Sequence, residues 1–145
     1  MRTLPVRRGQ GRQFAALPFV ERNGETVVML VTSRETRRWV LPKGWAEKGL
    51  TGAELAAKEA FEEAGLMGAV ATKRVGFYSY VKRLPDGEEM NCRVDVFPMH
   101  VGELLADWPE RGQRERRWFT LAQAAMEVEE GELVTLLLRL ASPTG

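Results

Sequence analysis

The first part of the chain has the apolar pattern of a β-hairpin. Residues 25–32, with the sequence ETVVMLVT, form a nearly continuous run of β-branched and apolar positions, which predicts a central strand. Residues 14–20 predict a strand before it, and the Asn23-Gly24 dipeptide between the two runs is a strong signal for a tight turn. The sequence therefore predicts an antiparallel strand pair at the start of the fold.

The second half of the chain combines long strands with C-terminal helices. Residues 69–81 and 89–101 predict two strands, with the turn-forming residues 85–87 (Pro-Asp-Gly) between them. A short helix is predicted over residues 121–126, and a leucine stripe predicts a final helix within residues 131–140. This order of elements suits a mixed sheet that is covered by helices on both faces.

One amphipathic helix is predicted between these two halves. Thr51 and Glu54 have the spacing of a capping box, so the helix begins at Gly52, and Gly65 stands where a left-handed residue ends a helix. One face of this helix is made mostly of small residues, which suits close packing on a sheet. Its members are Ala53, Ala56, Ala57, Ala60, Phe61 and Ala64.

The same helix carries three carboxylates on one stripe. Glu59, Glu62 and Glu63 stand at i, i+3 and i+4, so their like charges repel one another. Lys58 reaches Glu62, but one ammonium does not neutralise three carboxylates. A hard divalent cation does, because Mg²⁺ takes oxygen ligands from carboxylates together with substrate phosphates. An isolated acidic stripe is usually a solvated helix face, so the surrounding residues must decide between the two interpretations.

Composition and charge narrow the class of protein. The 145 residues are 44% hydrophobic, which predicts a single domain over residues 1–145, with residues 1–12 as a loose basic arm. The 21 basic and 20 acidic residues give a net charge of +1, so no general attraction to duplex nucleic acid or to a membrane is expected. The lone Cys92 and the shortness of the apolar runs predict a cytoplasmic protein. For the oligomeric state, we expect a monomer or a homodimer.

Gly44 and the run KEAFEEAGL from Lys58 to Leu66 resemble the Nudix box, G-x5-E-x7-R-E-U-x-E-E-x-G-U, in which U is aliphatic. The spacing matches without a gap, but Leu50 replaces the first glutamate and Lys58 replaces the arginine. In the Nudix family those two residues help to brace the loop against the helix, while the E-x-x-E-E carboxylates hold the metal. The departures therefore concern the loop geometry, and Glu47 is a candidate substitute for the missing carboxylate.

This resemblance implies an α/β fold, the Nudix-type α/β/α sandwich with a mixed β-sheet, and Mg²⁺ (with Mn²⁺ as the alternative) as cofactor. It implies that Glu59, Glu62, Glu63 and the carbonyl of Gly44 ligate the metal. Glu59 and Glu62 are the candidate catalytic residues, with Glu62 either a ligand or the group that orients or deprotonates the attacking water. Four glutamates elsewhere remain alternative bases: Glu88, Glu89, Glu110 and Glu115.

Basic residues supply the second half of a predicted phosphate site. Arg34 and Arg38 precede the Gly44 loop, and their guanidinium groups suit phosphate oxygens; Lys43 is a further candidate. The patterns S-R…R-W-V-L-P-K-G and D-W-P-E…R-R-W-F resemble the diphosphoinositol polyphosphate and diadenosine polyphosphate hydrolase branch of the family, which implies a phosphate contact for Arg116. Arg12, beside the first strand, is the last candidate.

Two functions of different classes compete. The first is a Mg²⁺-dependent pyrophosphohydrolase, in which water attacks a phosphoanhydride bond of a polyphosphorylated small molecule. Its substrate is a diadenosine polyphosphate, a diphosphoinositol polyphosphate or a nucleoside diphosphate derivative. The second is a non-catalytic Nudix-fold module that binds a phosphorylated ligand. Such modules usually lose box carboxylates, so the retention of Glu59, Glu62 and Glu63 favours the enzyme.

The first testable prediction concerns Glu63. Replacing it in Glu63→Gln removes a metal-binding charge, so turnover of polyphosphorylated substrates is lost while thermal stability stays near that of the wild type. Activity of the purified variant with Mg²⁺ and a substrate panel measures this. Full activity of Glu63→Gln would refute a metal seat on this helix.

Overall fold

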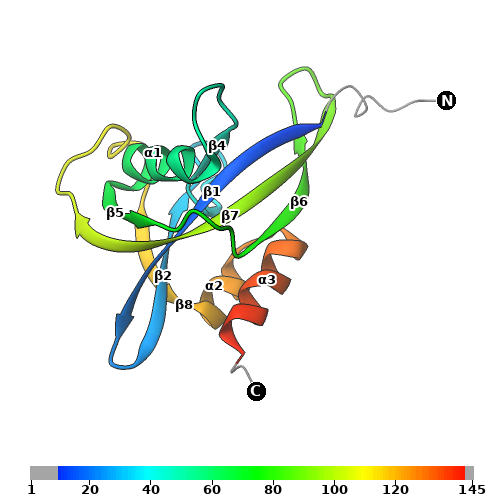
Figure 1. Ribbon diagram of the computed structural model, residues 1–145. Helices are drawn as coiled ribbons and strands as arrows, with labels where there is room; N and C mark the ends of the chain where they lie inside the picture. The colour runs from blue at the N-terminus through cyan, green and yellow to red at the C-terminus, as the bar shows by residue number, and fades with distance from the viewer. Residues whose placement is uncertain (1–9, 143–145) are drawn as a thin grey trace.

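The computed structural model describes residues 10–142, which form a mixed β-sheet with helices on both faces (Figure 1). The strands are β1 (Gly11–Arg22), β2 (Glu25–Thr32), β3 (Trp39–Val40), β4 (Lys43–Trp45), β5 (Leu66–Val70), β6 (Gly76–Arg83), β7 (Glu89–Leu104) and β8 (Arg116–Thr120). The helices are α1 (Gly52–Ala64), α2 (Leu121–Glu127) and α3 (Gly131–Ala141). Most of the predicted basic arm lies outside the described residues, and its last two positions, Gly11 and Arg12, belong to β1.

The sheet is mixed because its two longest strands run in the same direction. Its order is β3-β2-β1-β7-β5, while β4 pairs with β1, β6 with β7, and β8 with β2. β1 and β7 are parallel, from Gly11 opposite Cys92 to Phe19 opposite His100, and the other pairs are antiparallel. The two halves of the chain are therefore joined through the β1–β7 pair.

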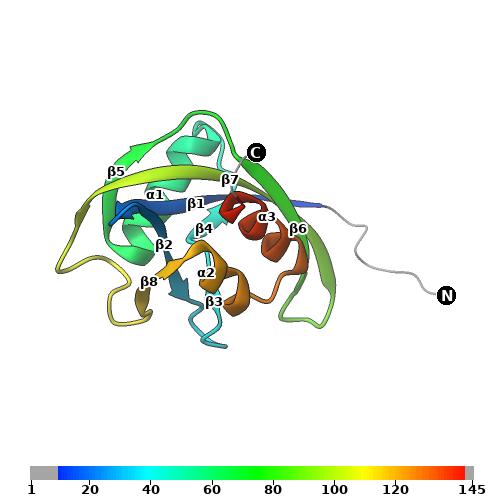
Figure 2. The same cartoon turned by 90° about the horizontal axis from the view of Figure 1, so that it is seen from below.

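Helix α1 covers one face of this sheet, and α2 and α3 cover the other, as Figures 1 and 2 show. Ala56, Ala60 and Ala64 of α1 are fully buried against Ala16, Met29 and neighbouring strand residues. On the opposite face, leucines of α3 pack on a separate cluster that contains Val28, Val94 and Tyr78. The predicted α/β/α sandwich with a mixed sheet is confirmed. Among the described residues, no helix is long and apolar enough to span a membrane.

The local signals at the ends of α1 and in the first hairpin are confirmed. The Thr51 hydroxyl accepts a hydrogen bond from the Glu54 amide at 3.1 Å, and the Glu54 side chain accepts one from the Thr51 amide at 2.9 Å. Gly65 ends the helix in the left-handed region with φ 67°. Asn23 and Gly24 form the tight turn between β1 and β2, with φ values of 52° and 79°. One prediction for the helix surface was wrong, because Phe61 is 38% exposed.

The single strand predicted over residues 69–81 is wrong, because the structure divides it into β5 and β6. Both strands pair with β7 on its side opposite β1, and the chain leaves the ladder over residues 71–75. The interruption faces Pro98, whose carbonyl accepts from the Ala71 amide at 2.9 Å but which has no N–H to return. A proline inside β7 therefore favours the break between β5 and β6. The connecting residues 71–75 bring Arg74 to Asp95 of β7.

The C-terminal end of α1 is held by Trp108, in the segment before β8, and by Arg116, the first residue of β8. The Arg116 guanidinium donates to the carbonyl oxygens of Ala64 and Leu105, each at 2.8 Å, and stacks on the Trp108 ring at 4.0 Å. The Trp108 indole donates to the Glu63 carbonyl at 3.2 Å. These contacts satisfy carbonyls that a helix end leaves unpaired, and they fix α1 against the rest of the fold.

We predict that Gly65→Ala destabilises the protein more than Gly24→Ala does. Both glycines have positive φ, so alanine costs about 1 kcal/mol of backbone strain at each position. A Cβ at Gly65 would also come within 2.6 Å of the Trp108 ring, whereas a Cβ at Gly24 meets nothing within 4 Å. Urea unfolding of both variants measures the difference. Equal losses would show that Trp108 does not press on the helix end.

Candidate active site

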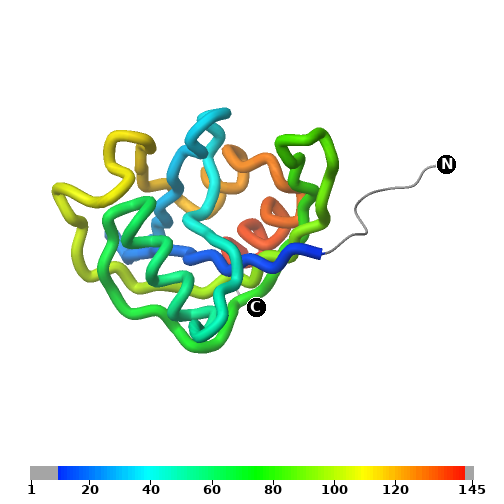
Figure 3. Tube along the Cα trace, turned by 90° about the horizontal axis from the view of Figure 1, so that it is seen from above, coloured from blue at the N-terminus to red at the C-terminus, as the bar shows by residue number. Residues whose placement is uncertain are grey.

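A cleft of about 390 Å³ opens between α1, β4 and the loops that follow β2 and β7. Figure 3 shows the loops at residues 33–38, 84–88 and 105–115 extending on the same side of the molecule. The cleft brings together acidic and basic side chains from distant parts of the sequence. The acidic ones are Glu47, Glu59, Glu63 and Glu110, and the basic ones are Arg34, Lys43, Lys82 and Arg114.

Glu59 and Glu63 lie in contact at the floor of this cleft, one helical turn apart on α1. Their carboxyl groups are hydrogen-bonded to each other, and the Lys43 amide donates to Oε1 of Glu63 at 3.3 Å. The Glu59 carboxyl also presses on the backbone of Gly44, where a Cβ would lie only 2.5 Å from its Cδ atom. A glycine at position 44 is therefore required for β4 to approach the carboxylates this closely.

Burial and mutual repulsion make this pair hold a proton. Burial raises the pKa of the Glu63 carboxyl to about 8; the charge of Arg114 opposes this shift, and the hydrogen bond to Glu59 reinforces it. Burial likewise raises the pKa of Glu59. Without a cation, two adjacent carboxylates do not ionise together easily. A divalent cation would replace that proton, since it supplies the positive charge that the pair lacks.

A salt bridge between loop and helix substitutes for the two box residues that this chain lacks. The Lys58 ammonium lies 2.8 Å from Oε2 of Glu47, and this hydrogen bond raises the pKa of Lys58. Glu47 precedes Leu50 by three residues, in the loop between β4 and α1. The pair ties that loop to the helix, which is the bracing role that the resemblance gives to the missing glutamate and arginine.

The three box carboxylates do not converge equally. Glu62 does not line the cleft; its side chain is 34% exposed, and its carboxylate lies 3.9 Å from the Lys58 ammonium. Within residues 10–142, no group of three Asp, Glu, His or Cys side chains is arranged as a metal site. The donor set nevertheless fits Mg²⁺, which binds through one or two carboxylates plus substrate phosphates. Glu59 and Glu63 supply those carboxylates, and Gly44 lies against them.

A second, mostly basic chamber of about 440 Å³ continues from the cleft. It shares Arg34, Lys43 and Lys82 with the first chamber and adds Arg38 and Arg83. The predicted residues Arg34, Arg38 and Lys43 are thus brought together, whereas sequence reasoning missed Lys82 and Arg83. Little in the sequence indicated that Lys82 and Arg83 belong to a site, because an exposed Lys-Arg pair before a turn is ordinarily solvated.

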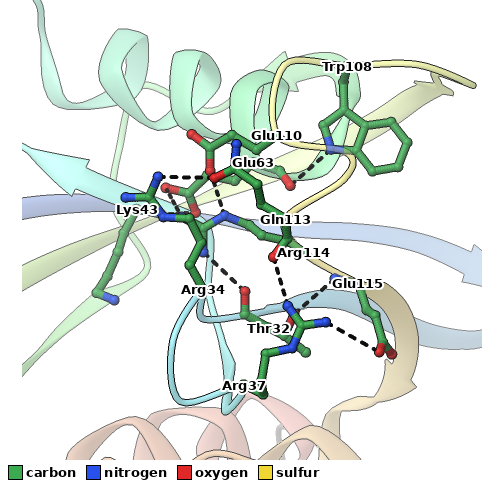
Figure 4. A network of polar contacts seen from close by, with 10 residues as sticks. All are labelled: Thr32, Arg34, Arg37, Lys43, Glu63, Trp108, Glu110, Gln113, Arg114 and Glu115. Atoms are coloured by element: carbon green, nitrogen blue, oxygen red, sulfur yellow. Dashed lines mark hydrogen bonds and ion pairs between the residues drawn. The ribbon is translucent and has the colours of Figure 1, made fainter.

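Arg114 lies beside Glu63 and Glu110, as Figure 4 shows. Its side chain is only 10% exposed, its Nη2 atom lies 3.8 Å from Glu63, and its Nε donates to Glu110 at 2.6 Å. It also donates to the Thr32 carbonyl at 3.1 Å. Sequence reasoning missed it because Arg116, two residues later, fitted the looser family pattern.

Two predicted phosphate ligands lie elsewhere. Arg116 does not line either chamber, because its guanidinium binds the carbonyls at the end of α1. Arg12 also lies outside both chambers and forms an ion pair with Asp95 at 2.9 Å on the α1 side of the sheet. Neither placement supports a phosphate contact in the cleft. Of the two neighbouring arginines, Arg114 and not Arg116 lines the cleft.

The candidate bases from other loops are also separated by the structure. Glu110 lines the cleft, with its carboxylate bound to Arg114. Glu88 and Glu89 lie by the β6–β7 turn, and Glu115 lies 3.8 Å from Arg37, so none of these three lines either chamber. Glu110 is therefore the only one of the four that is positioned to act in the cleft.

Comparison with known proteins gives a consistent picture. Residues 10–137 match the NUDIX domain family. Nudix hydrolase 12, mitochondrial, of Arabidopsis thaliana is 37% identical over 100 residues, which cover 67% of this chain and 49% of that protein. Diphosphoinositol polyphosphate phosphohydrolase 2 of Rattus norvegicus is 28% identical over 120 residues, covering 81% of this chain and 63% of that protein. The chain spans about half the length of the Arabidopsis relatives that it matches.

A solved structure agrees with the fold. The crystal structure of C. elegans Ap4A hydrolase has a TM-score of 0.67 and covers 91% of this chain and 96% of its own. Its sequence is 14% identical, so the likeness concerns the fold alone.

We predict that Glu63→Gln stabilises the metal-free protein increasingly as the pH rises. The pKa of the Glu63 carboxyl is raised from 4.5 to about 8, so the folded protein is stabilised by the protonated carboxyl. This stabilisation is fully present below pH 4.5, and it is lost as the pH rises to about 8. The neutral amide avoids that loss, which is on the order of 5 kcal/mol for a shift of this size. The thermal stability of Glu63→Gln is therefore expected to equal that of the wild type only at acidic pH, near 4.5 and below.

Thermal melts in EDTA between pH 5 and pH 9 measure this effect. Glu62→Gln, on the more exposed carboxylate of the same helix, is the matched control and should show no comparable gain. A difference between wild type and Glu63→Gln that is independent of pH would contradict the shared proton.

Proposed function

Because the chain belongs to the Nudix family, we propose that it is a divalent-metal-dependent hydrolase of phosphoanhydride bonds in small polyphosphorylated molecules. One observation carries this proposal. A carboxylate pair, Glu59 and Glu63, whose neighbouring cation Arg114 is shared with Glu110, lies in the same cleft as the basic side chains of Arg34, Lys43 and Lys82. A ligand that bridges the two regions must bear negative charge and must arrive with, or meet, a cation at the carboxylates.

Glu59 and Glu63 are the residues that would hold Mg²⁺, with the Gly44 carbonyl as a further proposed ligand and Glu62 reaching it only by a change of side-chain conformation. When bound, the ion neutralises phosphate charge and lowers the pKa of a coordinated water. The Lys43 amide orients Glu63 through its hydrogen bond at 3.3 Å. This interaction fixes the carboxylate before substrate enters, which is the preorganisation that electrostatic catalysis requires.

Glu110 is the candidate for holding the proton of the attacking water. It lines the cleft, and the hydrogen bond that it accepts from Nε of Arg114 at 2.6 Å holds its carboxylate in place. Glu62 remains the alternative from the box itself. Arg114 links Glu110 to Glu63 and keeps the loop before β8 close to α1.

The basic chamber supports a highly phosphorylated substrate. Five basic side chains and two glutamates, Glu35 and Glu130, line about 440 Å³ beside the metal seat, which leaves an excess of positive charge; the basic residues are Arg34, Arg38, Lys43, Lys82 and Arg83. We therefore propose that a diphosphoinositol polyphosphate or a diadenosine polyphosphate is cleaved faster than a nucleoside diphosphate derivative. The name of the rat relative agrees with this choice. The chain's cytoplasmic location stays a prediction.

The non-catalytic binding module is the weaker alternative. A module that only binds phosphate has no use for two carboxylates in contact, because they repel the ligand unless a cation is present. The chain keeps Glu59 and Glu63 in that arrangement and braces their helix with the Glu47–Lys58 pair.

We predict that Lys82→Gln raises KM for diphosphoinositol polyphosphates roughly fivefold and leaves kcat nearly unchanged. Lys82 lines both chambers but does not touch the carboxylate pair, so it contributes to substrate binding rather than to the chemical step. Steady-state hydrolysis with Mg²⁺, across a panel that includes diadenosine polyphosphates and nucleoside diphosphate derivatives, measures both constants.

Lys73→Gln is the matched control, since it removes the same charge from a residue outside both chambers. Absence of turnover on the whole panel by the wild type, with ligand binding retained, would favour the binding module. An equal effect of both variants on KM would show that the basic chamber does not receive the substrate.

A further inference from the structure

Three arginines meet on the α1 side of the sheet, outside the active-site cleft. Arg12 of β1, Arg74 of the segment between β5 and β6, and Arg93 of β7 all bind the carboxylate of Asp95. The donor–acceptor distances are 2.9, 3.3 and 3.1 Å, respectively. Arg12 and Arg93 are register partners in the parallel β1–β7 pair. These four residues, called the Asp95 cluster below, line neither chamber of the cleft.

The Asp95 cluster has an excess of positive charge. Burial raises the pKa of the Asp95 carboxyl, but hydrogen bonds from Arg12 and Arg93 and the charge of Arg74 outweigh it, so the pKa is lowered and the group is ionised. Arg12 and Arg74 bind the same oxygen, Oδ2, so their guanidinium groups are only a few ångströms apart. Within residues 10–142, all ion pairs of these arginines go to Asp95, and one negative charge faces three positive ones.

The carboxylate lies beneath the guanidinium groups and leaves them accessible. The side chain of Asp95 is 4% exposed, whereas those of Arg12, Arg74 and Arg93 are 55%, 42% and 41% exposed. Each guanidinium has five N–H donors, and the bond to Asp95 uses one of them. Several donors from three strands or loops therefore face solvent at one place, in the forked geometry that suits phosphate oxygens.

The arginines are also held in position before any ligand arrives. Phe77 of β6 is 47% exposed, and the guanidinium carbons of Arg93 and Arg74 lie 4.0 and 5.3 Å from the centre of its ring. Figure 1 shows α1 lying toward the β5 end of the sheet, with the β6–β7 hairpin extending beyond it. Side chains already fixed by an ion pair and an aromatic ring lose little further entropy on binding an anion.

We propose that the Asp95 cluster is a second anion site, which binds a small polyphosphate with at least two adjacent phosphate groups. The uncompensated positive charge and the remaining guanidinium donors match such a ligand better than a monoanion. The site needs neither the metal nor the carboxylate pair, so it is independent of the proposed hydrolysis. It also gives Arg12 the type of ligand expected from the sequence, at a different place in the fold.

Titration with inorganic tripolyphosphate in EDTA and low salt tests the site. Amide chemical shifts of the ¹⁵N-labelled protein should move saturably in β6 and β7 around Phe77, Arg93 and Asp95. Without a divalent cation, the acidic part of the cleft does not favour a polyanion. Arg74→Gln should weaken binding about tenfold, because one charge-assisted contact is lost. Arg22→Gln, a matched charge removal at the β1–β2 hairpin, should leave the affinity unchanged.

Arg74→Lys is the second variant, because it keeps the charge but not the fork, and an intermediate affinity is expected. Thermal melts of each variant confirm that it is folded. Equal affinities for Arg74→Gln and Arg22→Gln, or shifts confined to the cleft and its basic chamber (around Gly44, Glu63, Arg34 and Arg38), would overturn the proposal. So would binding of a single-stranded oligonucleotide at the cluster without binding of tripolyphosphate. None of these results depends on whether the cleft hydrolyses a substrate.

Discussion

The contact between the Glu59 and Glu63 carboxyls is the interaction on which the cleft depends. Two like charges one helical turn apart would separate into solvent on a free helix, yet here they lie side by side, with Glu63 buried and the half-buried Glu59 against the backbone of Gly44. The fold supplies the free energy for this arrangement through the packing of α1 on the sheet, since Ala56, Ala60 and Ala64 permit a close approach. A strained pair of this kind is relieved by a proton or by a cation, so it is ready to bind a metal.

Several contacts hold α1 in the position that keeps the Glu59 and Glu63 carboxyls together. Lys58 ties the helix to Glu47 in the preceding loop, and Trp108 and Arg116 hold the carbonyls at its C-terminal end. The loss of the usual glutamate and arginine from the box therefore does not loosen the loop, because a lysine and a glutamate three residues earlier make an equivalent contact. The brace is defined by the opposite charges and the reach of the side chains, and not by fixed positions in the motif.

Features of the fold and the site could be predicted from the sequence when they depend on residues that are close together along the chain. The capping box, the Asn23-Gly24 turn and the helix stop at Gly65 depend on neighbouring residues, and the sequence was sufficient for them. The break between β5 and β6 depends on Pro98, about 25 residues further along, which a reading of residues 69–81 alone does not include. The choice between Arg114 and Arg116 depends on which carbonyls and carboxylates lie opposite them in space, and neither pattern nor spacing contains that information.

The contacts of the arginines show why basic residues in a sequence do not by themselves locate a phosphate site. Arg116 contributes its donors to carbonyl oxygens at a helix end, whereas Arg12, Arg74 and Arg93 share a single buried acid and keep most of their donors exposed. A cation is available to a ligand only when the acceptors around it are too few, and that condition is a property of the packed structure. Among residues 10–142, Lys82 of the basic chamber meets this condition, whereas Arg38 and Arg83 form ion pairs with Glu129 and Glu89. The condition holds again at Asp95, where one acid serves three arginines.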